Sequence, residues 1–296
     1  MSSKQIDFDG NWKRVVGSLF EDFLTFFAPN LAELVDWSRQ PDDLNRELQR
    51  LQPEGRSRNR QADSLYRVHL KDKSTIPVLV HLEVQGWDDV DFHKRMFQYF
   101  YRILDLYGEN IYTLVIYIND NEKYMPNRYQ YEFYGTKLYF EFNTFVIKEQ
   151  QEEELIQSPN PFSFVVLAAK KAVQIKTKNE VTKYEIKRQL LGILSEQIRR
   201  NALDNKTVAA LFRFVDNIIK LDNLQAKFKR EVINEWEGGF MLSYDEEIKQ
   251  EGIKQGKEQG IKVIKLLLEE VPIEEIARKL NLSIKEVIEI RDKFYQ

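Results

Sequence analysis

Residues 80–120 decide the fold of the N-terminal half of the chain, and their sequence is VHLEVQGWDDVDFHKRMFQYFYRILDLYGENIYTLVIYIND. The start of this stretch completes an apolar run, Ile76–Gln85, which is typical of a strand covered on both faces. Apolar side chains at helical spacing predict a helix over Phe92–Tyr107, ending at Gly108. A second buried strand is predicted over Ile111–Ile118. A strand, helix and strand of these lengths favour a parallel crossover.

Working outward from this unit, periodicity predicts further elements on both sides. An amphipathic helix is expected over Trp12–Phe27 and an alternating strand over Leu65–Leu70, joined to the next strand by a turn. Two more strands are expected, at Tyr131–Tyr134 and Leu138–Ile147. Residues 1–150 are therefore interpreted as one α/β domain.

The second half of the chain is predicted to be all helical. Residues 151–240 carry helical periodicity in four segments, Pro161–Ile175, Lys183–Arg200, Lys206–Leu221 and Leu224–Glu237. Residues 241–296 begin with a charged segment with glycines at 252, 256 and 260, each of which costs a helix about 1 kcal/mol relative to alanine. A helix there is expected to be weak, hinged or stabilised by a partner.

The last residues have the outline of a helical hairpin. Within Val271–Phe294, Ser283 and Glu286 have the spacing of a capping box at the start of a second helix. This outline fits either a DNA-binding helix-turn-helix or a hairpin for self-association. The mixture of acidic and basic side chains on the second helix favours a homo-oligomer through these helices.

Composition excludes several classes of protein. The chain has 296 residues, 43% hydrophobic, 31% charged, with a net charge of −3 and no cysteine. Disulfide scaffolds, cysteine zinc sites and cysteine nucleophiles are thereby excluded. No apolar run is long enough to span a membrane and no secretory signal is recognised, so a cytoplasmic location is expected. The near-neutral charge disfavours bulk coating of nucleic acid but allows a local basic channel.

The residues best suited to chemistry are Asp63, Glu83 and Gln85. Period two along a strand places Glu83 and Gln85 on one face, and a hairpin brings Asp63 beside Glu83. Two carboxylates at a strand end suit Mg²⁺, which activates water and polarises a phosphodiester. The spacing alone favours a solvated strand face with a turn-forming aspartate. However, Glu83 in an otherwise apolar strand is costly unless it is paired or binds metal.

Val80–Asp120 resembles the Rpn family of recombination-promoting nucleases, also described as transposases, within the PD-(D/E)XK nuclease superfamily. The resemblance rests on Asp63 before a hairpin, on Glu83-x-Gln85 and on the run Arg95–Tyr99 in the following helix. It is looser over Trp12–Asp63, and the charged repeat Glu251–Lys262 is similar to the tails of these proteins. It implies a restriction-endonuclease-like mixed sheet flanked by helices, followed by an all-helical C-terminal region.

The resemblance also implies roles for individual residues. Asp63 and Glu83 would bind Mg²⁺ or Mn²⁺, with Glu21 of the first helix as an additional ligand or else a solvated residue. Gln85 takes the place of the superfamily's usual lysine, and an amide lacks the positive charge of that lysine. The glutamine variant is the form that this family shows.

Four arginines and one tyrosine are candidates for binding DNA. Arg95, Tyr99 and Arg102 recur at helical spacing, and Arg58 and Arg60 lie in the loop before Asp63. Each set has an ordinary structural interpretation, as an arginine face paired with acids or as a flexible basic loop. The expected function is a Mg²⁺-dependent DNA endonuclease. The alternative is a catalytically silent protein of the same fold that acts in DNA binding or assembly.

Overall fold

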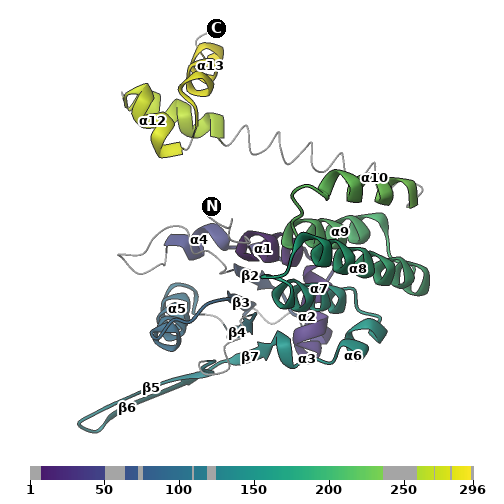
Figure 1. Ribbon diagram of the computed structural model, residues 1–296. Helices are drawn as coiled ribbons and strands as arrows, with labels where there is room; N and C mark the ends of the chain where they lie inside the picture. The colour runs from purple at the N-terminus through teal and green to yellow at the C-terminus, as the bar shows by residue number, and fades with distance from the viewer. Residues whose placement is uncertain are drawn as a thin grey trace. The chain divides into compact units, whose positions relative to one another are not determined.

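The computed structural model describes residues 8–50, 64–72, 76–108, 110–118, 125–235, 259–269, 271–280 and 282–294. The chain divides into two compact units, Met1–Glu235 and Trp236–Gln296. The first unit is a mixed α/β structure built around a five-stranded sheet, and the second is helical in its described residues (Figure 1).

The first unit begins with helices and continues into the sheet. Its elements up to the sheet's last strand are α1 (Phe8–Ser18), α2 (Phe20–Phe27), α3 (Pro29–Leu34), β1 (Asp42–Asp43), α4 (Asn45–Arg50), β2 (Ser64–Val68), β3 (Val78–Gln85), α5 (Phe92–Tyr107), β4 (Asn110–Tyr117), β5 (Arg128–Phe133), β6 (Thr136–Glu141) and β7 (Asn143–Val146). A 3-10 turn and five helices follow, namely η1 (Ile147–Glu149), α6 (Glu152–Gln157), α7 (Phe162–Gln174), α8 (Glu180–Asn201), α9 (Asn205–Ile218) and α10 (Gln225–Glu235).

The sheet has the strand order β1-β2-β3-β4-β7. Strands β1, β2 and β3 pair antiparallel, whereas β3, β4 and β7 pair parallel. The predicted hairpin before β3 and the predicted parallel crossover through α5 are therefore confirmed. The crossover helix ends as predicted at Gly108, whose φ of 61° is a left-handed conformation that glycine adopts without strain.

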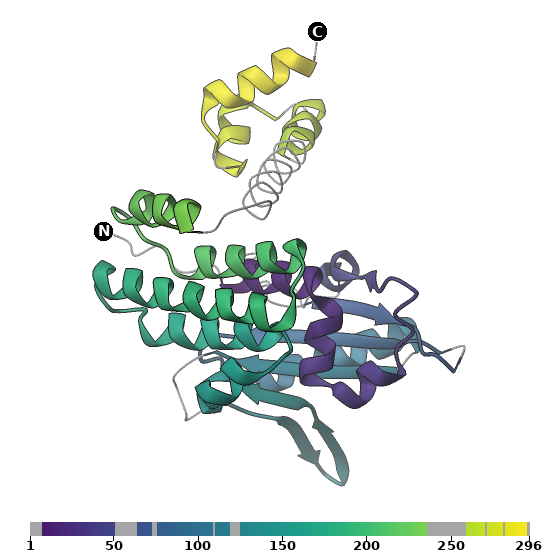
Figure 2. The same cartoon turned by 90° about the vertical axis from the view of Figure 1, so that its right-hand side faces the viewer.

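Helices cover both faces of this sheet, which explains why all eight residues of β3 are buried. One face packs against α5 and α4 through a cluster that contains Leu65, Leu79 and Ile103. The other face packs against α2, where Phe20 lies 4.5 Å from Tyr66 between ring centroids. Figure 2 shows the purple N-terminal helices in front of the blue strands.

Helices α7 and α9 share a core with the first helix of the chain. Trp12 of α1 is fully buried, with ring centroids 5.9 Å from Phe162 of α7 and 5.7 Å from Phe214 of α9. The predicted division near residue 150 therefore falls inside a unit whose helices and sheet pack together.

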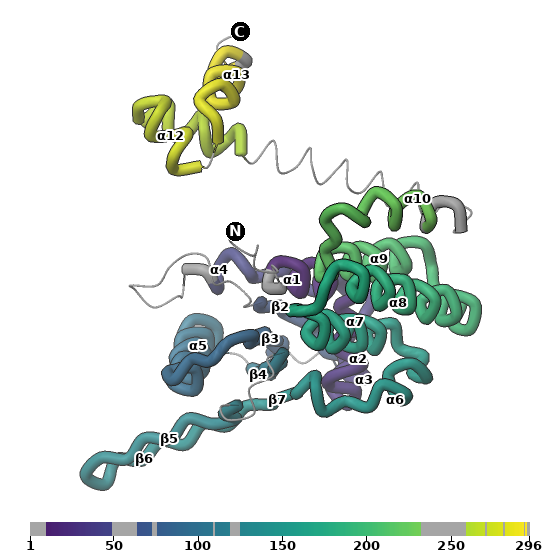
Figure 3. Tube along the Cα trace, in the orientation of Figure 1, coloured from purple at the N-terminus to yellow at the C-terminus, as the bar shows by residue number. Residues whose placement is uncertain are grey.

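Two expected elements are divided in the structure. The helix expected over Trp12–Phe27 breaks at Leu19, whose backbone is not helical (φ −126°, ψ 43°). The strand expected over Leu138–Ile147 becomes β6 and β7, which belong to different sheets. Strand β6 pairs instead with β5 in a separate two-stranded hairpin, which extends away from the sheet in Figures 1 and 3.

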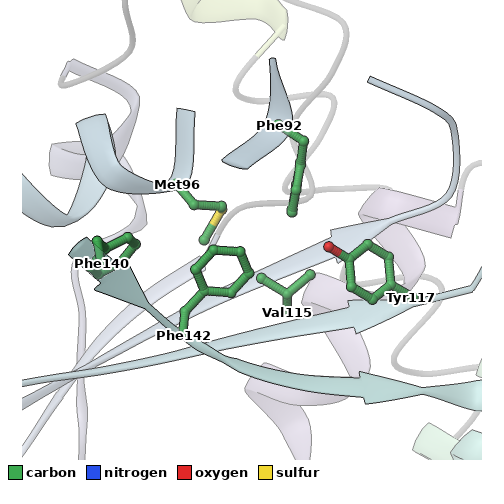
Figure 4. Close-up of a cluster of buried hydrophobic side chains, with 6 residues drawn as sticks. All are labelled: Phe92, Met96, Val115, Tyr117, Phe140 and Phe142. Carbon is green, nitrogen blue, oxygen red and sulfur yellow. The ribbon is translucent and has the colours of Figure 1, made fainter. Parts of the chain in front are cut away.

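The base of this hairpin is anchored by an aromatic cluster. Phe140 and Phe142 meet Phe92 and Met96 of α5, with Val115 and Tyr117 of β4 completing the cluster (Figure 4). The side chains converge from three parts of the chain, so the hairpin base and α5 are held against the same end of the sheet.

The second unit contains a helix at residues 259–268, followed by α12 (Ile273–Leu280) and α13 (Ile284–Phe294). Val263, Ile276 and Val287, one from each helix, form its small core. The predicted capping box is confirmed, because Ser283 N donates to Glu286 Oε2 at 2.8 Å and Glu286 N donates to Ser283 Oγ at 3.2 Å. Among the helices of the described ranges, none combines the length and the apolarity that crossing a membrane requires.

Candidate active site

The polar side chains of β3 face helix α5. Alternation along the strand puts Leu79 in the cluster with Ile103, and places on the same face three polar residues, His81, Glu83 and Gln85. Helix α5 runs antiparallel to β3. Arg95 therefore faces Glu83, and Ile103, two turns further along the helix, faces Leu79. Sequence periodicity correctly predicted that Glu83 and Gln85 share a face.

Arg95 of α5 is the centre of this polar group. Its Nη2 donates to Glu83 Oε1 at 3.0 Å and to Gln85 Oε1 at 3.2 Å, and its Nη1 donates to Asp89 Oδ2. The guanidinium also lies over the ring of Phe92, with its carbon 4.8 Å from the ring centroid. Because Arg95, Glu83 and Gln85 are all buried, these charge-assisted bonds are shielded from water and from salt.

Asp89 is the member of the group that sequence reasoning missed. Its other carboxylate oxygen accepts from Asp91 N at 3.1 Å, and its backbone oxygen accepts from Phe92 N at 2.9 Å. Asp89 therefore fixes the start of α5 as well as binding Arg95. The available signal was an aspartate in a turn just before a helix, a position where aspartate commonly bonds to the backbone.

Glu83 has one carboxylate oxygen paired and one unpaired. Its side chain is about 2% exposed, and Oε2 has no hydrogen-bond partner among the residues that the structure describes. Leaving a buried acceptor unsatisfied costs roughly 1–3 kcal/mol, and more for a charged group. A hard cation prefers such an oxygen, so the donor chemistry of Glu83 fits Mg²⁺ or Mn²⁺.

Two further buried polar residues, His81 of β3 and Thr113 of β4, lie on the same face of the sheet. These residues lie side by side in the β3–β4 register, and their side-chain polar atoms have no hydrogen-bond partner within the described ranges. Burial, aided by the positive charge of Arg95, lowers the pKa of His81 to about 4. The imidazole is therefore neutral at neutral pH and packs against Tyr99, 5.5 Å away between ring centroids.

The remaining DNA-binding candidates on α5 are divided between buried and partly exposed positions. Tyr99 is buried beneath the helix against His81. Arg102 is partly exposed and lies seven residues along α5 from Arg95, roughly 10 Å at 1.5 Å per residue. It neighbours Ile103, which packs on Leu79, so Arg102 lies toward the opposite end of β3 from Glu83.

Glu21 is not brought to this group. It is exposed in the first turn of α2, and α2 covers the sheet face opposite to α5. The five-stranded sheet therefore separates Glu21 from Glu83, so Glu21 is not a ligand of a metal ion bound at Glu83. Its neighbour Asp22 has a pKa raised to about 6 by burial and by the negative charges of Glu21 and Asp204.

The predicted ligand Asp63 and the basic residues Arg58 and Arg60 lie outside the described residues. Asp63 directly precedes Ser64, which pairs with Leu82, the residue before Glu83. Within the described ranges, no group of three or more acidic, histidine or cysteine side chains is arranged to hold a metal ion.

Comparisons of this chain with protein-family models, curated proteins and solved structures found no match. The resemblance to the Rpn family therefore rests on the residues quoted above.

Proposed function

We propose that the chain is a Mg²⁺-dependent DNA endonuclease of the restriction-endonuclease-like fold, acting at the end of β3 that carries Glu83. One observation carries the proposal. In a fully buried strand whose other polar residues are His81 and Gln85, the carboxylate of Glu83 has one oxygen held by Arg95 and the other without a partner among the described residues. A purely structural role leaves the cost of that free oxygen unexplained.

Glu83 and Asp63 are the residues that would hold the ion. The β2–β3 pairing supports this assignment, because chain continuity puts Asp63 next to Ser64, whose partner precedes Glu83. When bound, Mg²⁺ or Mn²⁺ supplies Lewis-acid activation of a water and of a phosphodiester oxygen.

Arg95 holds Glu83 in position, and Gln85 in turn bonds to Arg95. The guanidinium fixes the orientation of the carboxylate through Oε1, so that Oε2 stays available. Gln85 bridges Arg95 and the backbone oxygen of Trp87, which anchors the loop that follows β3. The charge of Arg95 also offsets the acidic groups beside it and reduces their repulsion of a phosphate backbone. Arg95 is therefore a positioning residue in this proposal.

The test is nicking of supercoiled plasmid DNA by the full chain in Mg²⁺ or Mn²⁺. Glu83→Gln keeps the shape of the side chain and removes its charge, so nicking should fall at least a hundredfold. Glu153→Gln, an exposed glutamate on α6, is the matched control and should nick as the wild type does. Equal nicking by wild type and Glu83→Gln would remove Glu83 from the mechanism.

A second candidate function, a non-catalytic DNA-binding or assembly protein, is favoured by a different observation. Arg95 already neutralises Glu83, and Gln85 lacks the charge of the superfamily's lysine. Calorimetry with Mn²⁺ separates the two candidates. Saturable binding that disappears in Glu83→Gln supports the nuclease, whereas the absence of saturable binding to the wild type supports the silent protein.

Three further sequence predictions stay predictions. DNA is the proposed partner, the C-terminal helices are a proposed site of self-association, and the proposed location is the cytoplasm.

A further inference from the structure

The hairpin of β5 and β6 has one apolar face that is covered only at its base. Tyr129 stacks on Phe97 of α5 at 5.4 Å, and Phe140 lies 4.7 Å from Phe100, both between ring centroids. Beyond this base the aromatic side chains are exposed, with accessible fractions of 46% for Tyr131, 60% for Phe133, 96% for Tyr134 and 57% for Tyr139. Tyr131 and Phe133 continue the covered face, Tyr134 forms the turn, and Tyr139 lies on the opposite face, where its hydroxyl donates to Glu141 Oε2 at 2.9 Å.

A hairpin that exposes aromatic side chains in this way is expected to have a binding partner. A two-stranded hairpin alone is at best marginally stable in water, and an apolar patch on the surface commonly marks an interaction site. The charges of the hairpin balance, with Arg128 and Lys137 against Glu132 and Glu141. The hairpin therefore has no net electrostatic attraction for a phosphate backbone, which favours a protein over a nucleic acid as its binding partner.

The outer edge of β6 is free to pair. Strand β6 continues through Phe142 into β7, the last strand of the five-stranded sheet, and no described strand pairs with the outer edge of either. Phe142 N donates to the oxygen of Asn127 at 2.9 Å, which fixes the alternation of the hairpin's hydrogen bonds. By that alternation the backbone groups of Lys137, Tyr139 and Glu141 point away from β5.

We infer that two copies of this chain associate by pairing their β6 strands antiparallel, with the two-fold axis at Tyr139. This register places Lys137 of each copy opposite Glu141 of the other, so both pairs join opposite charges. It also places Leu138 beside Phe140 of the second copy. Each exposed outer half of a hairpin then lies against the base of the other hairpin, where α5 covers the same face.

The surface that this pairing covers is small. Tyr139 of one copy lies beside Tyr139 of the other on one face and Leu138 beside Phe140 on the other face, whereas Tyr131 and Phe133 lie one strand further from the paired edge. The interface depends mainly on backbone hydrogen bonds and on the two charge pairs, so we expect a weak, reversible dimer. Pairing also removes the unpaired edge that makes exposed strands prone to aggregation.

The test measures the mass of the full chain by sedimentation equilibrium at protein concentrations from about 1 to about 100 µM, a range that brackets a reversible dimer of this size. The wild type should be a dimer at the upper concentrations. Lys137→Glu and Glu141→Lys should each weaken the dimer roughly tenfold or more, because each converts both cross-strand pairs to like charges. Mixing these two variants should restore dimers that contain one copy of each, as should combining both substitutions in one chain.

Two control variants keep the charged edge of β6 intact. Glu132→Lys removes the 3.0 Å ion pair between Glu132 and Lys137 within the hairpin but leaves Lys137 and Glu141 in place, so the dimer should persist. Lys178→Glu makes the same charge change as Lys137→Glu on an exposed residue outside the hairpin and should also remain dimeric.

Three outcomes would overturn the inference. They are a wild type that stays monomeric at the highest concentration, a dimer that Lys137→Glu leaves unchanged, and mixed charge variants that fail to pair. A dimer sensitive to Glu132→Lys alone would assign the interface to β5 instead. The proposal is independent of nuclease activity, because none of these residues belongs to the Glu83 group.

Discussion

Replacing Arg95 by methionine should destabilise the first unit by about 3–5 kcal/mol. The guanidinium supplies bonds to Glu83, Gln85 and Asp89, and methionine can make none of them. Because Glu83 is about 2% exposed, water cannot replace the lost partner. Removing one member of a buried ion pair leaves an uncompensated charge, and the cost of that charge sets the magnitude.

The reverse substitution, Glu83→Gln, should be milder, at about 1–2 kcal/mol. The amide oxygen still accepts from Arg95, and Arg95 keeps its pair with Asp89. The double variant should therefore cost at least about 1 kcal/mol less than the sum of the single variants, because it no longer contains a buried unpaired carboxylate.

The assay is urea unfolding at pH 7, followed by tryptophan fluorescence and far-ultraviolet circular dichroism. Lys94→Met is the matched control, since Lys94 is an exposed cation one residue before Arg95 on the same helix, and it should cost less than about 0.5 kcal/mol. A cost for Arg95→Met no larger than that of the control, or strict additivity in the double variant, would refute the reasoning.

Three other predictions follow from buried charges and a helix cap. The pKa of Asp22 is raised to about 6 in the folded chain, so the ionised carboxylate destabilises the fold above that pH. Asp22→Asn should therefore raise the free energy of unfolding at pH 8 by roughly 1 kcal/mol after allowance for solvent screening, and this gain should vanish toward pH 4. A gain that did not change with pH would contradict this. Asp216→Ala should cost about 3–5 kcal/mol because it removes the carboxylate, 2.7 Å away, that balances the charge of the fully buried Lys187, leaving only Gln225 and the ring of Phe228 beside the ammonium. Lys187→Met should cost less than half as much, and equal urea midpoints for the two variants would argue against this reasoning. Ser283→Ala should weaken the start of α13 by about 1 kcal/mol and speed its hydrogen exchange roughly fivefold while α5 is unaffected, and unchanged exchange in α13 would show that the cap contributes nothing.

The parts of the fold that sequence predicted are those set by local periodicity. Alternation in β3 put Glu83 and Gln85 on one face, and the apolar stripe of α5 with Gly108 gave the bounds of the crossover helix. The same stripe placed Arg95 on that helix, where it was expected to bind phosphate, whereas the structure has it buried and bonded to Glu83. Each of these depends on the spacing of side chains within a single element.

The parts that sequence could not predict depend on tertiary contacts. Leu19 interrupts the first helix two residues after Gly17, a glycine that weakens a helix but does not by itself fix where the helix ends. The strand pattern runs unbroken through Phe142, although the chain there leaves the hairpin and enters the sheet. The bond from Arg95 to Asp89 depends on the path of the loop before α5, which no periodicity describes.

The burial of Trp12 between two distant helices has a consequence for synthesis. Its neighbours, Phe162 and Phe214, come about 150 and 200 residues later in the chain. At roughly 5–20 residues per second, a ribosome needs about 10–40 seconds to deliver the second of them. During that interval the indole of the nascent N-terminal helix lacks both of these partners, and transiently exposed apolar surface of this kind favours aggregation of the emerging chain until α9 has been made.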